Sequence, residues 1–316
     1  MKLAPLFAQP GGPVVATPDA GGGGIDALRS DLDRHAGDWD GLLLEHGAIL
    51  FRDYALDGAA DFEAAVTALG GESDSYVGGN SPRTRVLHDV FTATDYPASE
   101  RISLHNELSY RPSWPRRLFF FCDLPALRGG QTPLARGGDV LRAMPAEIVE
   151  SLRTRRVNYV RCFHPALRMG KSWQATYDTD DRDRVDEILR AQGSVGRWSA
   201  DGGLRVSTVC DAFAVHPVTG QEVWFNQAEQ WHPSALAPPL RALLEPRGQL
   251  AHDCEFGDGT PMDDAMLAQV RQVVDAHRLQ FDWRKGDLLM LDNVLVMHGR
   301  EPFSGSRRTL AYLSRR

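Results

Sequence analysis

The sequence SLHNELSY (Ser103–Tyr110) places a histidine and a glutamate two positions apart in a segment expected to be extended. Because residues i and i+2 of a strand point to the same side, the imidazole of His105 and the carboxylate of Glu107 are expected to converge on one volume of space. Burying such a pair is costly unless it serves a purpose. Two interpretations follow: the side chains pair with each other, or they share a metal ion that needs a third ligand from elsewhere.

The composition is that of a globular protein, with 42% hydrophobic and 24% charged residues in a chain of 316. A formal net charge of -7 argues against a nucleic-acid partner, because Lys and Arg are not in excess. The N-terminal apolar run is interrupted by Pro5 and Pro10, too early for a signal peptide or a membrane span. We therefore expect a cytoplasmic protein with no membrane partner. Its four cysteines contain no Cys-x-x-Cys pair and are expected to be packed, reduced thiols.

Short strands outnumber helices along most of the chain. Glycine and proline predict a loop at residues 10–24, and the whole segment 1–24 is expected to be loop-rich. Helical spacing predicts helices at 25–46, 61–69, 145–156, 180–193 and 261–278. Strand-like runs are expected at residues 47–54, 117–124, 156–163, 207–217, 221–226, 287–293 and 308–315.

This pattern indicates a mainly β protein with peripheral helices, of the α+β class, built on a double-stranded β-helix, that is, a jelly-roll or cupin-like core. No internal repeat or break in composition marks a second domain. We therefore expect residues 1–316 to form a single domain.

A third ligand is suggested by DNVLVMHGREPFSGSRRTL, where His298 follows a predicted strand. Two histidines and one carboxylate on one face of an octahedron leave three positions open, the arrangement that suits Fe(II) in oxygen-activating enzymes. Arg308, on the next predicted strand, is expected to bind the distal carboxylate of 2-oxoglutarate in bidentate fashion. Thr132, after the Gly129-Gly130 turn, is expected to offer a hydroxyl to the same carboxylate.

Several stretches together carry a resemblance to a known family: GAILFRDY, YPASERISLHNELSY, GGQTPLARGG, SWQATYDTDDR, HPVTGQEVWFNQ and DNVLVMHGREPFSGSRRTL. The sequence resembles the taurine/2-oxoglutarate dioxygenase (TauD/TfdA-like) family of Fe(II) enzymes, from about Gly47 to the C-terminus. Within the family it is similar to the branch containing the aspartyl hydroxylase of syringomycin biosynthesis and clavaminate-synthase-like proteins.

The resemblance implies Fe(II), 2-oxoglutarate and O2 as cofactor and cosubstrates, with His105, Glu107 and His298 as iron ligands and Arg308 and Thr132 as 2-oxoglutarate-binding residues. It implies hydroxylation of an unactivated C–H bond, coupled to decarboxylation of 2-oxoglutarate, in specialised-metabolite biosynthesis. Taurine-type enzymes have a substrate-binding arginine four residues past the one for 2-oxoglutarate. This chain has Tyr312 there, which argues against a sulfonate substrate.

The branch acts on amino acids or their derivatives, free or tethered to an acyl or peptidyl carrier protein. Candidate substrate-binding residues are Arg83, Arg111, Asn226 and Tyr312, with Arg85 and Arg117 as further cations near the first ligand pair. Trp224 and Phe225 are equally well interpreted as core residues. An acidic carrier protein needs a basic docking face on a chain of this net charge, and RTRR (Arg153–Arg156) is the candidate.

Three alternatives stay open. With the same cofactors, the reaction ends in desaturation or ring formation instead of hydroxylation. Alternatively the chain is a non-catalytic jelly-roll binding or sensor protein, which is expected to have lost a ligand or Arg308. The third is a zinc hydrolase that uses His216 and His232, although no acidic motif completes that pair.

Overall fold

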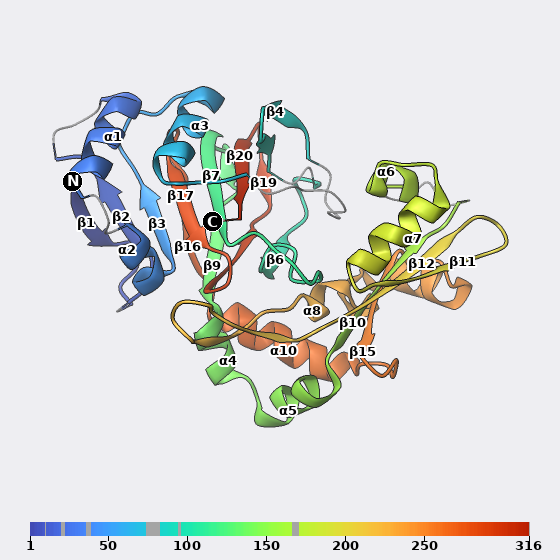
Figure 1. Cartoon of the computed structure of the whole chain (residues 1–316). Helices are drawn as coiled ribbons and strands as arrows, with labels where there is room; N and C mark the ends of the chain where they lie inside the picture. The colour runs from blue at the N-terminus through green and yellow to red at the C-terminus, as the bar shows by residue number, and fades with distance from the viewer. Residues whose placement is uncertain are drawn as a thin grey trace.

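Two facing β-sheets form the jelly roll in a computed structural model that describes residues 1–9, 11–19, 23–35, 39–73, 83–93, 96–165 and 171–315. The expectation of a jelly-roll core with peripheral helices is confirmed (Figure 1). Among the described residues, the larger sheet has the order β1-β2-β3-β17-β7-β20-β5-β4. The smaller sheet has the order β16-β9-β18-β6. All neighbours in these two sheets run antiparallel except β2 and β3.

The strands of the larger sheet come from both ends of the chain. They are β1 (Lys2–Pro5), β2 (Val14–Thr17), β3 (Ala48–Phe51), β4 (Arg85–Leu87), β5 (Val90–Thr92), β7 (Arg117–Leu124), β17 (Leu288–Asp292) and β20 (Arg308–Ser314).

The smaller sheet carries the candidate ligands. It consists of β6 (Ile102–His105), β9 (Thr132–Arg136), β16 (Leu279–Phe281) and β18 (Val296–Arg300), and a two-stranded ribbon of β8 (Arg128–Gly129) and β19 (Phe303–Ser304) adjoins it in the chain.

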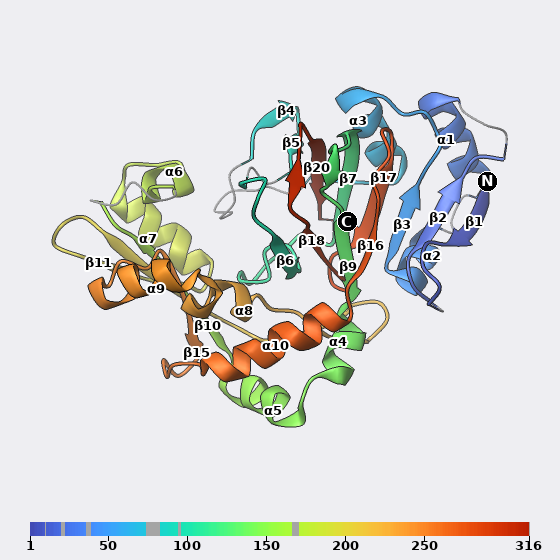
Figure 2. The same ribbon diagram turned by 180° about the vertical axis from the view of Figure 1, so that it is seen from behind.

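Both faces of the larger sheet are covered, which explains why RLFFFCDL is apolar without alternation. On β7, Leu118 and Phe120 pack in the cluster between the two sheets. Phe119 and Phe121 pack on the opposite face. That face is covered by α1 (Gly24–Arg34), α2 (Trp39–His46) and α3 (Gly58–Ala68) (Figure 2).

A long insertion, residues 137–276, lies between β9 and β16 and forms a second lobe beside the jelly roll (Figure 1). Its four-stranded sheet has the order β11-β12-β10-β15. The elements are α4 (Gly137–Ala143), α5 (Ala146–Arg155), β10 (Val157–Phe163), α6 (Trp173–Tyr177), α7 (Arg182–Ala191), β11 (Val195–Trp198), β12 (Leu204–Cys210), β13 (Phe213–Val215), β14 (Glu222–Trp224), α8 (Ala228–Trp231), the 3₁₀ turns η1 (Pro233–Ala235) and η2 (Glu245–Arg247), α9 (Pro238–Leu244), β15 (His252–Phe256) and α10 (Asp264–Ala276).

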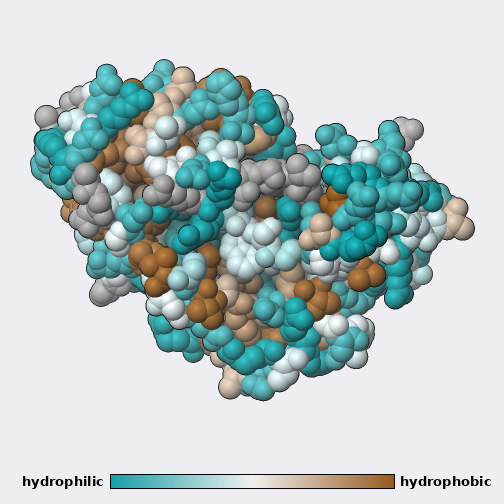
Figure 3. All heavy atoms as spheres, viewed as in Figure 1, coloured by the Kyte–Doolittle hydropathy of each residue, from teal (hydrophilic) through white to brown (hydrophobic). Residues whose placement is uncertain are grey.

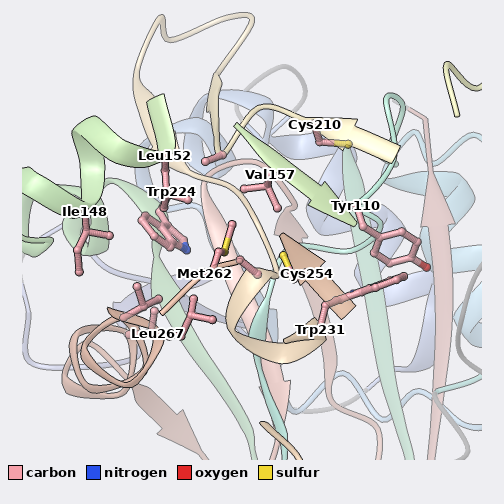
Figure 4. Close-up of a cluster of buried hydrophobic side chains, with 14 of the residues drawn as sticks. Tyr110, Ile148, Leu152, Val157, Cys210, Trp224, Trp231, Cys254, Met262 and Leu267 are labelled. Atoms are coloured by element: carbon pink, nitrogen blue, oxygen red, sulfur yellow. The ribbon is translucent and has the colours of Figure 1, made fainter. Parts of the chain in front are cut away.

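The insertion and the smaller sheet share a hydrophobic cluster. Ile148, Trp224 and Trp231 of the insertion belong to it (Figure 4). Leu104 and Met297, from β6 and β18, belong to the same cluster. The lobe is therefore packed onto the sheet that bears the candidate ligands. The single-domain organisation stays a prediction.

Most predicted elements are confirmed to within a few residues, with three corrections. Val14–Thr17 is a strand within the stretch expected to be a loop, because its buried residues pair with β1 and β3. The helix expected over 25–46 is two helices, and residues 36–38 between them lie outside the described residues. The strand expected at 207–217 is split between β12 and β13, which belong to different sheets.

The surface on the side of Figure 1 is largely hydrophilic, and its apolar side chains lie in small separate groups (Figure 3). This is the ordinary distribution of hydrophobic residues on a protein surface. Among the described residues, no helix combines the length and the apolar character that crossing a membrane requires. The four cysteines are free thiols, as expected.

Candidate metal centre and the pockets beside it

His105 and His298 lie side by side because β6 and β18 are paired with these two residues in register. Their ring centroids are 4.4 Å apart. Glu107 lies close to both, but not for the expected reason: β6 ends at His105, and Glu107 lies in the turn that follows. The prediction that the pair shares one face of a strand is therefore wrong, although the convergence of its side chains is confirmed.

The turn that carries Glu107 is held by Asn293, a fully buried residue between β17 and β18. The Oδ1 atom of Asn293 accepts a hydrogen bond from the backbone N–H of Glu107 at 2.7 Å. Its Nδ2 atom donates to the backbone oxygens of Glu107 at 3.0 Å and Pro115 at 2.8 Å. In turn, Nδ2 of Asn106 donates a hydrogen bond to the backbone carbonyl of Asn293 at 2.6 Å. These bonds fix the carboxylate relative to the strand that carries His298.

Three possible ligand atoms, one from each of His105, Glu107 and His298, lie within 4.8 Å of one another. Oε2 of Glu107 is 3.9 Å from Nε2 of His105 and 3.7 Å from Nε2 of His298. Nδ1 of His105 lies 2.9 Å from the Ser103 carbonyl, which only accepts, so this nitrogen carries the proton and the Nε2 lone pair is directed at the cluster. This donor set fits Fe(II) in a facial two-histidine, one-carboxylate site.

The protonation states of the cluster also suit a metal. Burial, helped by the neighbouring His298, lowers the pKa of His105 to about 4, so its ring is neutral at neutral pH. Burial alone would raise the pKa of Glu107, but the charge of Arg83 and the hydrogen bond from His298 lower it below its ordinary value. Neutral imidazole and ionised carboxylate are the forms that bind metal ions.

A small basic pocket, about 40 Å³ in volume, lies behind the cluster. His105, Glu107 and His298 line it, together with Thr132 and Arg307. Burial, followed by the charge of Arg300, lowers the pKa of Arg307 to about 10, so it stays positively charged at neutral pH. The pocket therefore offers a buried cation and a hydroxyl to an anionic ligand.

The Gly129-Gly130 turn allows Arg307 to occupy this position. Both glycines have positive φ, 72° and 73°. A Cβ on Gly130 would lie 3.0 Å from Cδ of Arg307, and one on Gly129 would lie 2.1 Å from the Pro302 carbonyl oxygen. Nε of Arg307 donates to the Gly130 carbonyl at 3.2 Å. The expected tight turn before Thr132 is confirmed. Thr132 lines the pocket, and its contact with 2-oxoglutarate stays a prediction.

Arg308, predicted to bind the distal carboxylate of 2-oxoglutarate, is not among the residues that line this pocket, whereas its neighbour Arg307 is. The Arg308 side chain is 63% exposed and forms an ion pair with Asp123. Arg308, Leu310 and Tyr312 lie on one face of β20, and Leu310 and Tyr312 pack in the outer cluster. Since successive strand residues point to opposite sides, Arg307 and Thr309 face the cavity instead. The pairing of β20 with β7 shifts register between Arg308 and Thr309.

Two substrate-binding predictions are corrected by the same packing. Tyr312 packs against Phe119 on the outer face of the larger sheet, with ring centroids 6.3 Å apart, and does not line the cavity. Asn226 is buried, and both ends of its amide are used by the backbone: Nδ2 donates to the Ala212 carbonyl, and Oδ1 accepts from the Ala228 N–H. Its role is to hold the chain before α8.

The arginines near the first ligand pair have different surroundings. Arg83 lies in the small pocket, with its guanidinium 2.9 Å from Oε1 of Glu107. Arg111 lines a separate pocket described below. Arg85 is exposed on β4 beside the ring of Phe91, and Arg117 pairs with Asp40. The structure therefore places Arg83 at the metal cluster and the other three outside the small pocket.

A larger pocket, about 330 Å³ in volume, opens in front of the cluster. His105 and Glu107 form part of its wall, so the candidate metal centre lies between the two pockets. Much of the remaining wall comes from the insertion: Gln227, Gln230, Trp231, Leu236 and His252. Sequence reasoning missed these residues, because no motif marks them.

The histidines of the zinc alternative do not meet in the structure. Nε2 of His216 contacts Oδ2 of Asp292 at 3.0 Å, whereas Nδ1 of His232 contacts the Ser234 hydroxyl at 2.9 Å. Within the described part of the chain, His105, Glu107 and His298 form the one group with metal-binding geometry. The zinc hypothesis is therefore not supported.

The RTRR segment is largely neutralised. Arg153 pairs with Glu222 at 2.6 Å, Arg155 with Asp258 at 3.1 Å, and Arg156 with Asp211 at 2.9 Å. Docking of an acidic carrier protein on this segment stays a prediction.

Comparison with known proteins identifies relatives along nearly the whole chain. The family model described as "Taurine catabolism dioxygenase TauD, TfdA family" matches residues 8–313. The dapdiamide synthesis protein DdaC of Enterobacter agglomerans is 33% identical over 271 residues, which cover 85% of this chain and 82% of that protein. A clavaminate synthase-like protein of Arabidopsis thaliana is 31% identical over 282 residues, which cover 87% and 83% of the two chains.

Solved structures with the same fold include PvcB of Pseudomonas aeruginosa, with a TM-score of 0.55 and 17% identity over 99% of this chain and 90% of that one. A taurine dioxygenase of Burkholderia xenovorans has a TM-score of 0.54 and 14% identity, over 99% of this chain and 88% of its own. These likenesses confirm the architecture.

Proposed function

The chain belongs to the taurine catabolism dioxygenase (TauD, TfdA) family, and from this premise we propose that this Fe(II)- and 2-oxoglutarate-dependent dioxygenase hydroxylates an unactivated C–H bond of an amino acid or amino-acid derivative. The observation that carries the proposal is the position of the His105, Glu107 and His298 cluster between a small basic pocket and a larger one.

The small pocket suits 2-oxoglutarate. The guanidinium of Arg307 binds its distal carboxylate, since a buried cation that cannot lose its proton at neutral pH holds an anion strongly. Nε1 of Trp283 donates to Oγ1 of Thr132 at 2.9 Å, which leaves the Thr132 hydroxyl hydrogen to bond the same carboxylate. When bound, Fe(II) and 2-oxoglutarate supply the oxidising power that breaks the C–H bond, and 2-oxoglutarate ends as succinate.

The larger pocket suits a substrate with N–H donors. Nε2 of Gln227 donates to the Asn106 carbonyl at 2.9 Å and to the Ser109 hydroxyl at 3.0 Å. Nε2 of Gln230 donates to the Ser103 carbonyl at 2.9 Å. The amide nitrogens are thus engaged, and the amide oxygens are left as acceptors for an ammonium or amide N–H. Amino acids and their amides carry such groups.

The names of relatives support a biosynthetic role. DdaC is a dapdiamide synthesis protein, and the Arabidopsis relative is clavaminate synthase-like. One solved structure with this fold is described as an oxygenase from an isonitrile synthetic pathway. We accordingly place the chain in specialised-metabolite biosynthesis, with a small amino-acid-like substrate delivered free or on a carrier protein. A cytoplasmic location stays a prediction.

The test begins without oxygen. Fe(II) and 2-oxoglutarate added together should produce the weak visible charge-transfer band of a bidentate 2-oxoglutarate complex, which a binding or sensor protein without this cofactor pair would not give. Free amino acids and carrier-loaded aminoacyl thioesters are then compared for succinate release in air. A product that gains one oxygen atom supports hydroxylation. A product that loses two hydrogen atoms would replace it with desaturation or ring formation.

A further inference from the structure

A third pocket, about 30 Å³ in volume, adjoins the larger one on the side of the insertion. Tyr110 and Trp231 line both pockets, and their ring centroids are 4.8 Å apart. Figure 4 shows the two rings beside each other at one end of the hydrophobic cluster. Tyr110 and Trp231 therefore form a wall that the two pockets share.

Two arginines give the third pocket its charge. Arg161, on β10, is 8% exposed and lies among aromatic rings, 5.8 Å from the ring centre of Tyr110 and 5.6 Å from that of Trp231. Arg111 contributes a second guanidinium. Tyr177 lines the same pocket as both arginines. Burial raises the pKa of its hydroxyl, and the charges of Arg161 and Arg111 both oppose the rise.

The remaining wall is suited to an anion of small size. Tyr177, Ser194 and Thr208 line it, the last two with their hydroxyl groups 2.8 Å apart and hydrogen-bonded to each other. The described residues of this wall include no aspartate or glutamate. A space of about 30 Å³ holds roughly two water-sized groups, the size of one carboxylate. Guanidinium groups bind carboxylates in bidentate geometry.

We propose that the Arg111 and Arg161 pocket is a binding subsite for a free carboxylate at the end of the substrate remote from the metal centre. This inference rests on the proposed function, because it assumes that the substrate occupies the larger pocket. It specifies the substrate class: an elongated amino-acid derivative presented as a free acid. An acid whose single carboxyl group is tethered as a thioester has no free carboxylate to place there.

The test compares matched acids and amides. N-acetyl amino acids and N-acetyl dipeptides, each with a C-terminal carboxylate or carboxamide, are titrated anaerobically by calorimetry into the protein loaded with Fe(II) and 2-oxoglutarate. At least one acid is expected to bind about 10-fold or more tightly than its amide, the usual gain from a charge-assisted hydrogen bond. Arg161→Gln should abolish this preference and Arg111→Gln should reduce it. Arg190→Gln, at an exposed site on α7, should leave it intact.

Two results would overturn the subsite. One is a panel in which no acid binds better than its amide to the native protein. The other is a preference that persists in both the Arg111→Gln and Arg161→Gln variants. Two variants are used in case Arg161→Gln does not fold. Arg111 is only half-buried, so Arg111→Gln is expected to fold and still tests the subsite.

Failure of this inference is separable from failure of the proposed function. Succinate formed from 2-oxoglutarate by the iron-loaded protein without any added substrate reports on the dioxygenase centre alone. Succinate without acid preference removes the subsite and keeps the enzyme. An arginine-dependent acid preference without succinate keeps the subsite and removes the proposed function.

Discussion

The pockets on the two sides of the candidate metal centre differ in size and in chemistry. The rear pocket measures about 40 Å³ and is lined by three arginines, Arg83, Arg300 and Arg307. The front pocket measures about 330 Å³ and is lined by aromatic and amide side chains such as Trp231 and Gln230. The rear pocket is built by the jelly roll, whereas much of the front pocket comes from the insertion. The jelly roll therefore carries the candidate metal ligands and the rear pocket, whereas the insertion forms much of the wall of the pocket proposed for the substrate.

The strongest challenge to this comparison is to remove Glu107, one of the two candidate ligands that line both pockets. Glu107→Ala should abolish 2-oxoglutarate turnover and weaken Fe(II) binding by more than about 100-fold, because losing a direct ligand costs more than losing a residue that only orients one. Anaerobic Fe(II) titration measures the effect. Glu222→Ala removes a surface carboxylate that pairs with Arg153 and serves as the matched control. Normal iron affinity in Glu107→Ala would refute the ligand assignment.

Replacing Arg307 and Arg308 one at a time distinguishes an arginine of the rear pocket from its neighbour on the surface. Arg307→Ala should raise the concentration of 2-oxoglutarate required for half-maximal rate by about 100-fold, since a buried charged contact is lost. Arg308→Ala should change this 2-oxoglutarate concentration by less than about 3-fold, because the Arg308 side chain is 63% exposed and pairs with Asp123. Steady-state succinate assays give both values. The reverse order of effects would restore Arg308 to the role that the sequence predicts.

A smaller effect on the 2-oxoglutarate requirement is expected from Thr132, the uncharged residue that lines the same pocket as Arg307. Thr132→Val keeps the shape of the side chain and removes its hydroxyl. The 2-oxoglutarate requirement should rise by about 3- to 10-fold, the value of one neutral hydrogen bond. Substrate affinity in the front pocket should stay the same, and calorimetry on both ligands distinguishes the two. An equal loss for both ligands would mean that the pockets are not independent.

The front pocket is expected to show a change in stability only in acid. Burial, reinforced by the charge of Arg161, lowers the pKa of His252 to about 3. Between pH 6.5 and 3, the unfolded chain therefore binds a proton that the folded chain does not, and stability falls as the pH falls. His252→Gln removes this contribution, so the free energy of unfolding should decline less steeply, by about 1.4 kcal/mol per pH unit.

Urea unfolding at pH 7, 6 and 5 measures that slope. At pH 7 protonation of His252 contributes almost nothing to the free energy of unfolding, in the native protein as in His252→Gln. His88→Gln, at a histidine of the jelly roll that is largely exposed, is the control. Parallel slopes for the native protein and His252→Gln would show that the ring is solvated.

The jelly roll and its ligands could be predicted from the sequence for physical reasons. The apolar run of β7 and the strand of β20 are recovered because burial on both faces leaves a continuous signal. His105, Glu107 and His298 are recovered because ligand chemistry restricts the residue types that can serve. Glu107 reaches the cluster through a turn held by Asn293, a tertiary contact that the local pattern does not contain.

Positions that depend on packing could not be predicted. Arg307 and Arg308 are identical in type, and only the face of β20 on which each lies distinguishes them. The front pocket depends on where the insertion folds back on the smaller sheet, so Gln227, Gln230 and His252 carry no local signal. Tyr312 lies four residues past Arg308 on β20, so the two residues share a face of the strand. Because Arg308 faces away from the pocket, Tyr312 does too.

The order of strands in the larger sheet has a consequence for biosynthesis of the protein itself. β17 lies between β3 and β7, and β20 lies between β7 and β5, so strands made last occupy interior positions. While the ribosome is still translating, the earlier strands have exposed edges and no partners, which is a period of risk for aggregation. His105 and Glu107 likewise have no third ligand until His298 has been synthesised. The complete candidate metal centre can therefore form only after the strand that carries His298 has been made.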